Sequence, residues 1–119
     1  MVTAEHIRSL FQRYVDLVTR GDFAAIAELY ADDATVEDPV GSEPHRGRDA
    51  IREFYRASAG TVSLALEGRV RVAGKEAAAA MIARAGGMVI ETTDVMTFDD
   101  VGRITSMRAY WSPDTIYRE

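Results

Sequence analysis

Two ionisable side chains in this sequence stand where the surrounding pattern calls for apolar ones. Tyr14 lies within the apolar stripe of a helix that residues 3–20 predict. Asp94 shares the apolar face of an alternating strand with Ile90, Met96 and Phe98. No lysine or arginine lies on that face of the strand. Burying an ionised carboxylate without a partner costs several kcal/mol, so we expect Asp94 to be paired or protonated.

A second aspartate, Asp38, ends a short alternating segment. It shares a face with Val36 and is followed by Pro39, which has no backbone N–H to offer the carboxylate. Asp38, Tyr14 and Asp94 together could place a base and two acidic hydrogen-bond donors around one apolar cavity. Proton abstraction next to a carbonyl requires such a set. Taken singly, each also has an ordinary interpretation: a core tyrosine, an exposed strand-end aspartate, and an aspartate paired with a cation from another element.

Other combinations of reactive residues are weaker. Ser42, His45 and Asp49 have the residue types of a nucleophilic triad, but they lie within eight residues on a predicted loop and helix start. Glu37 and Asp38 are adjacent on a strand and point to opposite faces, so they cannot act as a facing carboxylate pair. The chain has no cysteine and only two histidines. We therefore expect no disulfide, no thiolate chemistry, no metal and no cofactor.

Length and charge narrow the class of partner. The 119 residues fit a single domain, 1–119. Nineteen acidic residues against fourteen basic ones give a net charge of −5, which disfavours binding to nucleic acid because phosphate contacts supply most of that affinity. No stretch approaches the roughly 18 apolar residues needed to span a membrane, and no signal peptide is recognisable. We expect a cytoplasmic protein with a small neutral ligand and no membrane or nucleic-acid partner.

Helical spacing dominates the first part of the chain. Residues 3–20 predict an amphipathic helix with Thr3 as its N-cap and Gly21 at its end. Residues 22–31 predict a second helix, and a third follows Gly47.

Strand alternation dominates the second half, where Gly74-Lys75, Gly86-Gly87 and Asp99–Gly102 are predicted turns. The alanines of residues 76–85 favour a helix by intrinsic propensity, but their place between two strand signals favours a strand. The order of elements predicts an α+β fold in which three N-terminal helices pack on a curved, mainly antiparallel sheet. The predicted strands are residues 62–72, 76–85, 89–98 and 103–111.

Three long segments also have a recognisable sequence. They are FQRYVDLVTRGD at residues 11–22, YADDATVEDPVGSEPHRGRDAIREFY at 30–55, and TTDVMTFDDVGRITSMRAYW at 92–111. Together they resemble the bacterial steroid Δ5-3-ketoisomerases, whose nuclear-transport-factor-2-like fold is a cone of helices and a curved sheet. Tyr14 in RYV, Asp38 in VEDP and Asp94 in the strand before the final turn fall on matching motif positions.

The resemblance implies a role for each of these residues. Asp38 is similar to the base that takes a proton from the carbon between the ketone and the isolated double bond, and returns it two carbons further along. Tyr14 and Asp94 are similar to two donors to the substrate's carbonyl oxygen, the latter a carboxylic acid that its apolar site keeps neutral. Tyr30 and Tyr55 match positions that support the catalytic tyrosine in some members. They are equally well explained as helix tyrosines of the core.

The remaining expectations follow from the same resemblance. They are a 3-oxo-Δ5 steroid substrate, a homodimer formed through the sheets, and a hairpin near Gly86-Gly87 that is shorter than in familiar members. A polyketide-cyclase-like enzyme and a non-catalytic ligand-binding or assembly module of the same fold are the alternatives. The expected walls of the steroid pocket are Val40, Phe54, Met81, Met96, Met107, Ala109 and Trp111.

Overall fold

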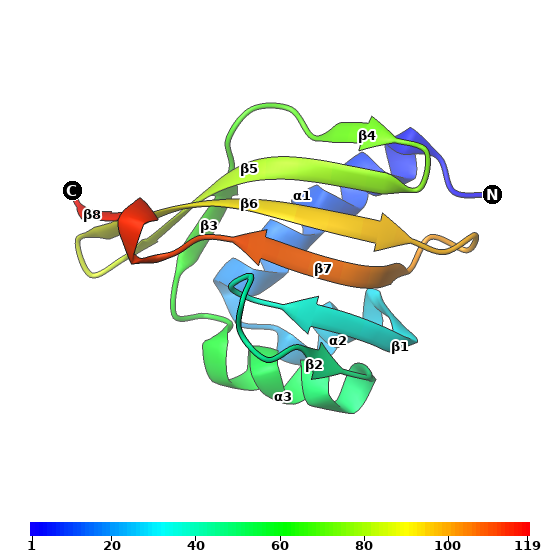
Figure 1. Cartoon of the computed structure of the whole chain (residues 1–119), viewed down its shortest axis with the longest axis horizontal. Coiled ribbons are helices and arrows are strands. Elements are labelled where there is room, and N and C mark those ends of the chain that lie inside the picture. Colours follow the sequence, from blue (N-terminus) through cyan, green and yellow to red (C-terminus); the bar gives the residue numbers. More distant parts are fainter.

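The computed structural model describes residues 1–119 as three α-helices and one mixed sheet (Figure 1). The helices are α1 (Ala4–Arg20), α2 (Phe23–Glu28) and α3 (Arg48–Ser58). A 3-10 helix, η1 (Pro113–Thr115), precedes the last strand. The strands are β1 (Tyr30–Glu37), β2 (His45–Arg46), β3 (Ser63–Leu66), β4 (Arg71–Ala73), β5 (Glu76–Ala85), β6 (Met88–Phe98), β7 (Ile104–Tyr110) and β8 (Ile116–Arg118).

The first helix has the boundaries that its sequence predicts. The side chain of Thr3 accepts a hydrogen bond from the His6 N–H at 3.1 Å, which satisfies one of the free donors at the start of α1. Gly21 ends α1 with φ at +78°, a left-handed conformation that favours glycine. Asp22 then caps α2 through the Ala25 N–H at 3.2 Å.

The predicted second helix is too long. It ends at Glu28, and the residues from Tyr30 onward form β1 instead. Tyr30 and Ala31 fit the apolar positions of a helix and of a strand equally well, so periodicity alone could not assign them. Tertiary pairing decides, because β1 runs parallel to β7, with Tyr30 opposite Ile104.

The sheet is mixed, and its order is β2-β1-β7-β6-β5-β3, with β4 paired to β5 and β8 paired to β6. The expected order of three helices before the sheet is therefore corrected, because β1 and β2 come before α3. The expected antiparallel pairing holds for every pair of strands except β1 and β7. The two-residue β2 and the β8 segment were not predicted, since both are too short to show a periodic pattern.

The alanine-rich segment 76–85 is a strand, as its context predicted. All ten residues of β5 pair with β6, and burial alternates along it. Ala77, Ala79, Met81 and Ala83 face the helices and are buried. Long-range pairing and burial thus override the helical propensity of alanine.

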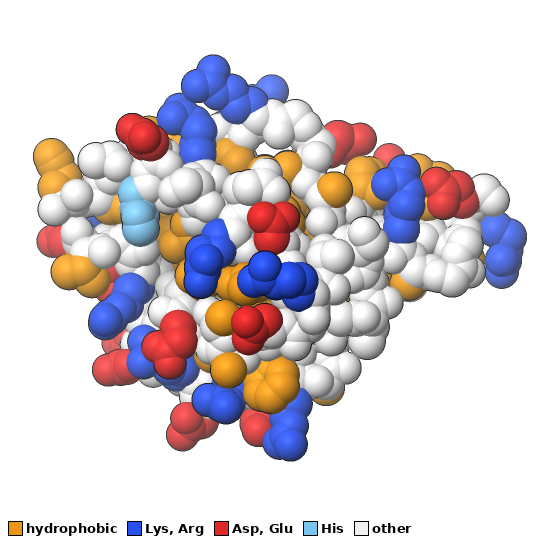
Figure 2. All heavy atoms as spheres, turned by 180° about the vertical axis from the view of Figure 1, so that it is seen from behind, with side chains coloured by type: hydrophobic (Ala, Val, Ile, Leu, Met, Phe, Trp, Pro, Cys, Tyr) orange, Lys and Arg blue, Asp and Glu red, His pale blue; other side chains and the backbone are white.

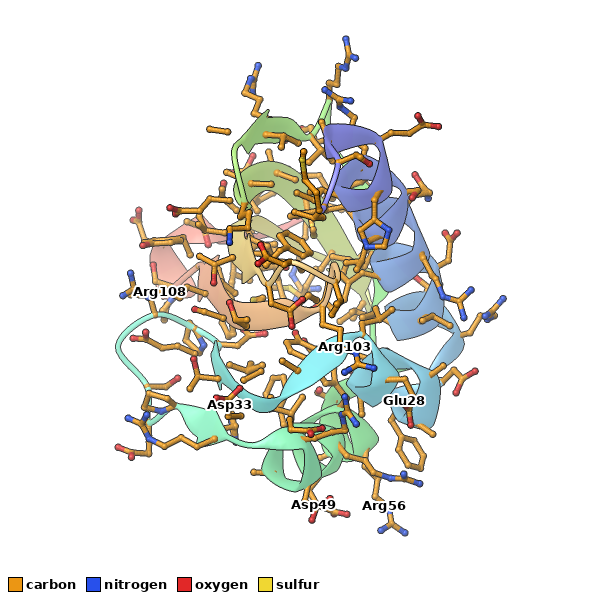
Figure 3. The ribbon with its side chains drawn as sticks, turned by 90° about the vertical axis from the view of Figure 1, so that its right-hand side faces the viewer. Glu28, Asp33, Asp49, Arg56, Arg103 and Arg108 are labelled. Carbon is orange, nitrogen blue, oxygen red and sulfur yellow. The ribbon has the colours of Figure 1, made fainter.

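The two faces of the sheet differ. One is covered by the helices, and 23 buried residues form the core between these layers. On the helical side of the molecule, basic and acidic side chains are interspersed (Figure 2). Charged residues such as Glu28, Asp49 and Arg56 point outward, away from this core (Figure 3). The outer face of the sheet has no helix over it (Figure 1). None of the helices is both long and apolar enough to cross a membrane.

The C-terminal ends of α1 and α3 meet backbone to backbone. The N–H of Gly60 donates to the carbonyl of Val18 at 2.8 Å. A Cβ atom added to Gly60 would lie 3.2 Å from the Cα of Gly21, which leaves almost no room for a side chain. This contact sets the spacing of the helices that carry Tyr14 and Tyr55.

Candidate active site

A cavity of about 220 Å³ lies between α1, α3 and the inner face of the sheet. Ten of its fifteen lining residues are hydrophobic, and a few polar groups converge among them. Tyr14 of α1, Asp38 at the end of β1 and Asp94 of β6 all line it, as does Tyr55 of α3. The other lining residues are Val18, Phe54, Ser58, Thr61, Val62, Leu64, Ala83, Ile90, Thr92, Ala109 and Trp111.

Asp94 is the one buried residue with a polar or charged side chain, and 3 % of its surface is exposed. On the sheet it lies between Ala79 of β5 and Ala109 of β7, and none of the five ion pairs of the protein involves it. Its one side-chain hydrogen bond comes from the Thr92 hydroxyl at 3.3 Å. Burial, and then the charge of Asp38, raise the pKa of Asp94 to about 8. Asp94 is therefore protonated at neutral pH and can donate a hydrogen bond.

Asp38 is half-buried and has a strong donor beside it. The indole Nε1–H of Trp111 donates to Asp38 Oδ1 at 2.6 Å. Burial raises the pKa of Asp38, while the Trp111 hydrogen bond and the charge of His45 oppose that rise. The result is a carboxylate that is more basic than an exposed aspartate. The sequence predicts Trp111 only as a wall of the pocket. Its hydrogen bond to Asp38 depends on the register of β1 against β7, which the sequence does not show.

Three tyrosine hydroxyls form a buried chain. Tyr55 OH lies 2.9 Å from Tyr14 OH and 2.7 Å from Tyr30 OH. Burial raises the pKa of all three phenols well above 10. If Tyr30 donates to Tyr55 and Tyr55 to Tyr14, the Tyr14 proton is left free for a ligand. Tyr30 lies on β1 rather than on a helix. It is both a fully buried core residue and a member of the hydrogen-bonded chain of hydroxyls.

The expected apolar walls are corrected in part. Phe54, Ala109 and Trp111 line the cavity, whereas Val40, Met81, Met96 and Met107 do not. The three methionines have no exposed surface and fill the core. Val40 lies in the turn beyond β1 and hydrogen-bonds to the Ala109 carbonyl. Alternation assigns a strand residue to the inner face, but it does not tell which part of that face the helices cover.

Several lining residues were missed by the sequence analysis. Val18 could have been found, since it lies one helical turn after Tyr14. Ile90 and Thr92 precede Asp94 on the same face of β6. Ser58, Thr61 and Val62 come from the end of α3 and the loop after it, where no periodicity could show which side chains turn inward.

The arrangement suits proton transfer at carbon. Nowhere do three His, Cys, Asp or Glu side chains come together as candidate metal ligands. The cavity instead presents one carboxylate and two neutral O–H donors to an apolar ligand. A carboxylate can remove a proton next to a carbonyl, while O–H donors stabilise the negative charge that develops on the carbonyl oxygen.

Comparisons with known proteins identify the family and several similar proteins. Residues 11–107 match the family described as the SnoaL-like domain. A protein named steroid Delta-isomerase, from Nocardioides simplex, is 50 % identical over an alignment of 111 residues that covers 90 % of each chain. The solved structure of SalBIII superposes with a TM-score of 0.88 at 30 % identity and covers 98 % of each chain. SalBIII is described as an epoxide hydrolase/cyclase-like enzyme with a role in pyran ring formation in the polyether salinomycin.

Proposed function

The chain belongs to the SnoaL-like family. From the geometry of its cavity and its likeness to a steroid Delta-isomerase, we propose that it is a steroid Δ-isomerase that converts 3-oxo-Δ5 steroids to their conjugated Δ4 isomers. One observation carries the proposal: a buried aspartic acid with a pKa of about 8 shares an apolar cavity with a half-buried aspartate. A non-catalytic binding module has no need of this arrangement. The likeness to the Nocardioides simplex isomerase supports the same conclusion.

The reaction proceeds through a dienolate. Asp38 takes a proton from the carbon between the C3 ketone and the Δ5 double bond, and the C–H electron pair moves toward the carbonyl oxygen. Tyr14 and Asp94 donate hydrogen bonds to that oxygen as it becomes negative. Protonated Asp38 then returns the proton two carbons further along. One such donor typically contributes about 2.7–4 kcal/mol of transition-state stabilisation, so two donors and a base account for a large acceleration.

The cavity gives the substrate its direction. The ketone points toward Tyr14 and Asp94, and the rings lie along Phe54, Ala109 and the other apolar walls. Each Å² of apolar surface removed from water contributes roughly 25 cal/mol to binding. Apolar contacts with these walls do not favour one orientation of the ligand, so the two polar donors fix which end of the ligand enters first.

Ultraviolet absorbance tests the proposal. The purified protein is mixed with a 3-oxo-Δ5 steroid, and the conjugated enone band is followed over time. We expect the band to appear with the wild-type protein and to appear far more slowly with Asp38→Asn. A ligand that binds without any growth of the band contradicts an isomerase and favours a binding module.

The SalBIII likeness supports a second candidate, a cyclase-like acid–base enzyme of the same fold. In that reaction Asp94 would protonate an epoxide oxygen as a C–O bond breaks, and Asp38 would take the proton of the attacking hydroxyl. Product analysis with an epoxy alcohol distinguishes the two candidates. Ring closure without isomerisation of the 3-oxo-Δ5 steroid would favour the cyclase.

We also propose that two copies pair through the outer face of the sheet. No helix covers this face, and it presents small or apolar side chains from adjacent strands, including Ala78 and Ala80 of β5 and Val95 of β6. Tyr110, which is 44 % exposed, extends it on β7. An uncovered face of this kind is typical of a surface that associates.

A further inference from the structure

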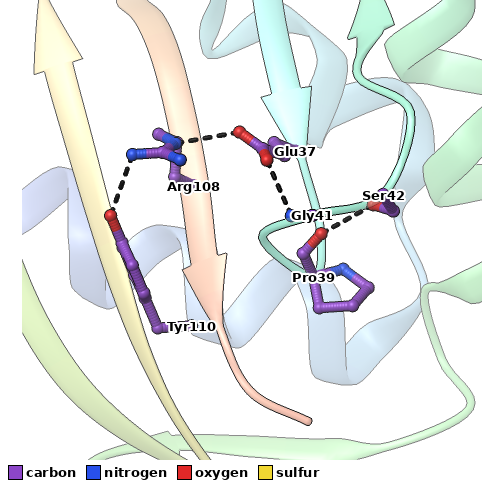
Figure 4. A network of polar contacts seen from close by, with 6 residues as sticks. All are labelled: Glu37, Pro39, Gly41, Ser42, Arg108 and Tyr110. Atoms are coloured by element: carbon purple, nitrogen blue, oxygen red, sulfur yellow. Dashed lines mark hydrogen bonds and ion pairs between the residues drawn. The ribbon is translucent and has the colours of Figure 1, made fainter.

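The turn that follows Asp38 is held from the outer face of the sheet (Figure 4). Ser42 donates to the Pro39 carbonyl from both its N–H, at 3.0 Å, and its hydroxyl, at 2.6 Å. Gly41, the third residue of the turn, has φ at +100°, which a residue with a Cβ rarely adopts. The turn therefore has a defined shape, and Asp38 leads directly into it.

Glu37 fastens this turn to the sheet. Its Oε2 accepts the Gly41 N–H at 2.7 Å, and its Oε1 accepts Arg108 Nε–H at 2.9 Å (Figure 4). Arg108 also donates to the Tyr110 hydroxyl at 2.9 Å, and its guanidinium lies 5.5 Å from the centre of the Tyr110 ring. The Gly41 hydrogen bond, and then the Arg108 contact, lower the pKa of Glu37. Glu37 is thus a carboxylate at neutral pH, with both oxygens engaged.

The geometry brings these contacts to bear on Asp38. Adjacent strand residues point to opposite faces, so Glu37 is held outside while Asp38 points into the cavity. Beyond Asp38, the Val40 N–H donates to the Ala109 carbonyl at 2.8 Å. The backbone is thus fixed on both sides of Asp38. The 2.6 Å hydrogen bond from Trp111 to Asp38 requires this alignment.

We propose that Glu37, through its hydrogen bond to Gly41, is a positioning residue that holds Asp38 against Trp111 and in line with the reacting carbon. The proposal rests on the isomerase function for its kinetic readout. Without the Gly41 hydrogen bond the turn loosens, and the Trp111 hydrogen bond to Asp38 is made only part of the time. Loss of that bond raises the pKa of Asp38, because the Trp111 N–H stabilises its charged form.

Three variants separate the two contacts of Glu37. Glu37→Met removes both, Glu37→Gln keeps an acceptor for the Gly41 N–H, and Arg108→Met leaves the Gly41 bond intact. Lys75→Met is the matched control, because it breaks a 2.8 Å surface ion pair with Asp100 that lies far along the sheet. We expect kcat to fall at least about tenfold in Glu37→Met, since misplacing a catalytic group by 1 Å can cost about a hundredfold. KM and kcat of the other three variants stay within about threefold of wild type.

The sole tryptophan supplies a readout that needs no turnover. Trp111 is the one tryptophan of the chain, so its fluorescence reports the charge state of its Asp38 partner. The other titratable groups that interact with Asp38 are left unchanged by all of the variants. They are Tyr14 of α1, Tyr30 of β1, Tyr55 of α3, His45 of β2 and Asp94 of β6. Trp111 fluorescence is measured as a function of pH. The acidic transition that is lost in Asp38→Asn is the one that reports the titration of Asp38.

We expect the midpoint of the Asp38 fluorescence transition to move to higher pH in Glu37→Met and to stay in place in Glu37→Gln and Lys75→Met. If Glu37→Met does not fold, Glu37→Val replaces it, since valine suits a strand and offers no acceptor to the Gly41 N–H. A kcat and a fluorescence midpoint equal to those of wild type in the folded variant that lacks the Gly41 hydrogen bond would overturn the proposal. A shifted midpoint in a protein without isomerase activity would instead uphold the positioning role and refute the proposed reaction.

Discussion

Asp38 and Asp94 are the same residue type but have different tasks in the proposed reaction, and their surroundings make the difference. Asp94 is buried between two strands with one weak donor, so its pKa rises to about 8. Asp38 is half-buried and receives the Trp111 N–H, which limits the rise of its pKa. The charge on Asp38 also favours this division of roles, because it helps to keep Asp94 neutral. The pair supplies a base and an acid at one pH.

Asp38→Asn should remove most of kcat, because an amide cannot accept the proton. We expect a loss of at least about a hundredfold, the usual contribution of a positioned base. Binding of a phenolic steroid should change little, since Tyr14 and Asp94 remain. Turnover within about tenfold of wild type, a change of only about 1.4 kcal/mol, would show that another group is the base.

Asp94→Leu should lose about 2.7–4 kcal/mol of transition-state stabilisation, measured as kcat/KM, because a donor to the oxyanion is removed. Asp94→Asn keeps an N–H donor and should lose less. Asp100→Asn is the control, since Asp100 is an exposed carboxylate paired with Lys75. Full activity of Asp94→Leu would contradict the donor role.

Stability should depend on pH through Asp94. Its pKa is about 8 in the folded protein and near 3.8 when unfolded, so between these values the folded state binds more protons. The free energy of unfolding contributed by Asp94 is therefore largest below about pH 4 and falls as pH rises toward 8, by at most about 1.4 kcal/mol per pH unit. Urea denaturation across pH 4–8 should show a flatter dependence in Asp94→Leu than in wild type. Equal slopes would mean that Asp94 is ionised in the folded state.

At the scale of elements, local signals predicted most boundaries and long-range pairing decided the rest. Thr3 and Gly21 have cap chemistry that acts within one turn, so α1 was predictable. Tyr30 required knowledge of its partner Ile104, more than seventy residues away, so the first two residues of β1 were taken for helix. Tyr14 and Asp94 stood out as site residues because a polar group on an apolar stripe needs no partner to be noticed. The loop that carries Thr61 has no such signal.

The contact between the ends of α1 and α3 predicts an effect on catalysis. Gly60→Ala should push the helices apart, lengthen the 2.9 Å Tyr14–Tyr55 contact and lower kcat about tenfold. Gly68→Ala is the matched control, because Gly68 has the same left-handed φ, +83° against +84°, but no neighbour within 4 Å.

A double-mutant cycle tests the route of this effect. Where Tyr55→Phe has already removed the hydrogen bond to Tyr14, Gly60→Ala should cost much less kcat than it does alone. An equal loss in both backgrounds would assign Gly60 a general structural role.

At the scale of the whole molecule, the uncovered face of the sheet predicts association. Val95→Asp places a charge at the centre of this face and should convert dimers to monomers in sedimentation velocity. Val101→Asp is the control, because Val101 is 74 % exposed in the turn between β6 and β7. A wild-type protein that sediments as a monomer at high micromolar concentration would refute the dimer.

The parallel pairing of β1 with β7 also has a consequence for how the protein is made. Asp38 emerges from the ribosome early, but the strand that fixes it and the Trp111 that touches it come some seventy residues later. At about 5–20 residues per second, β1 waits several seconds or longer without its neighbour. Contacts so distant in sequence also slow folding, because a long loop must close before they form. Helix α1 can form before the later strands are made, whereas the pocket that needs Asp38 and Trp111 together can assemble only after Trp111 has been synthesised.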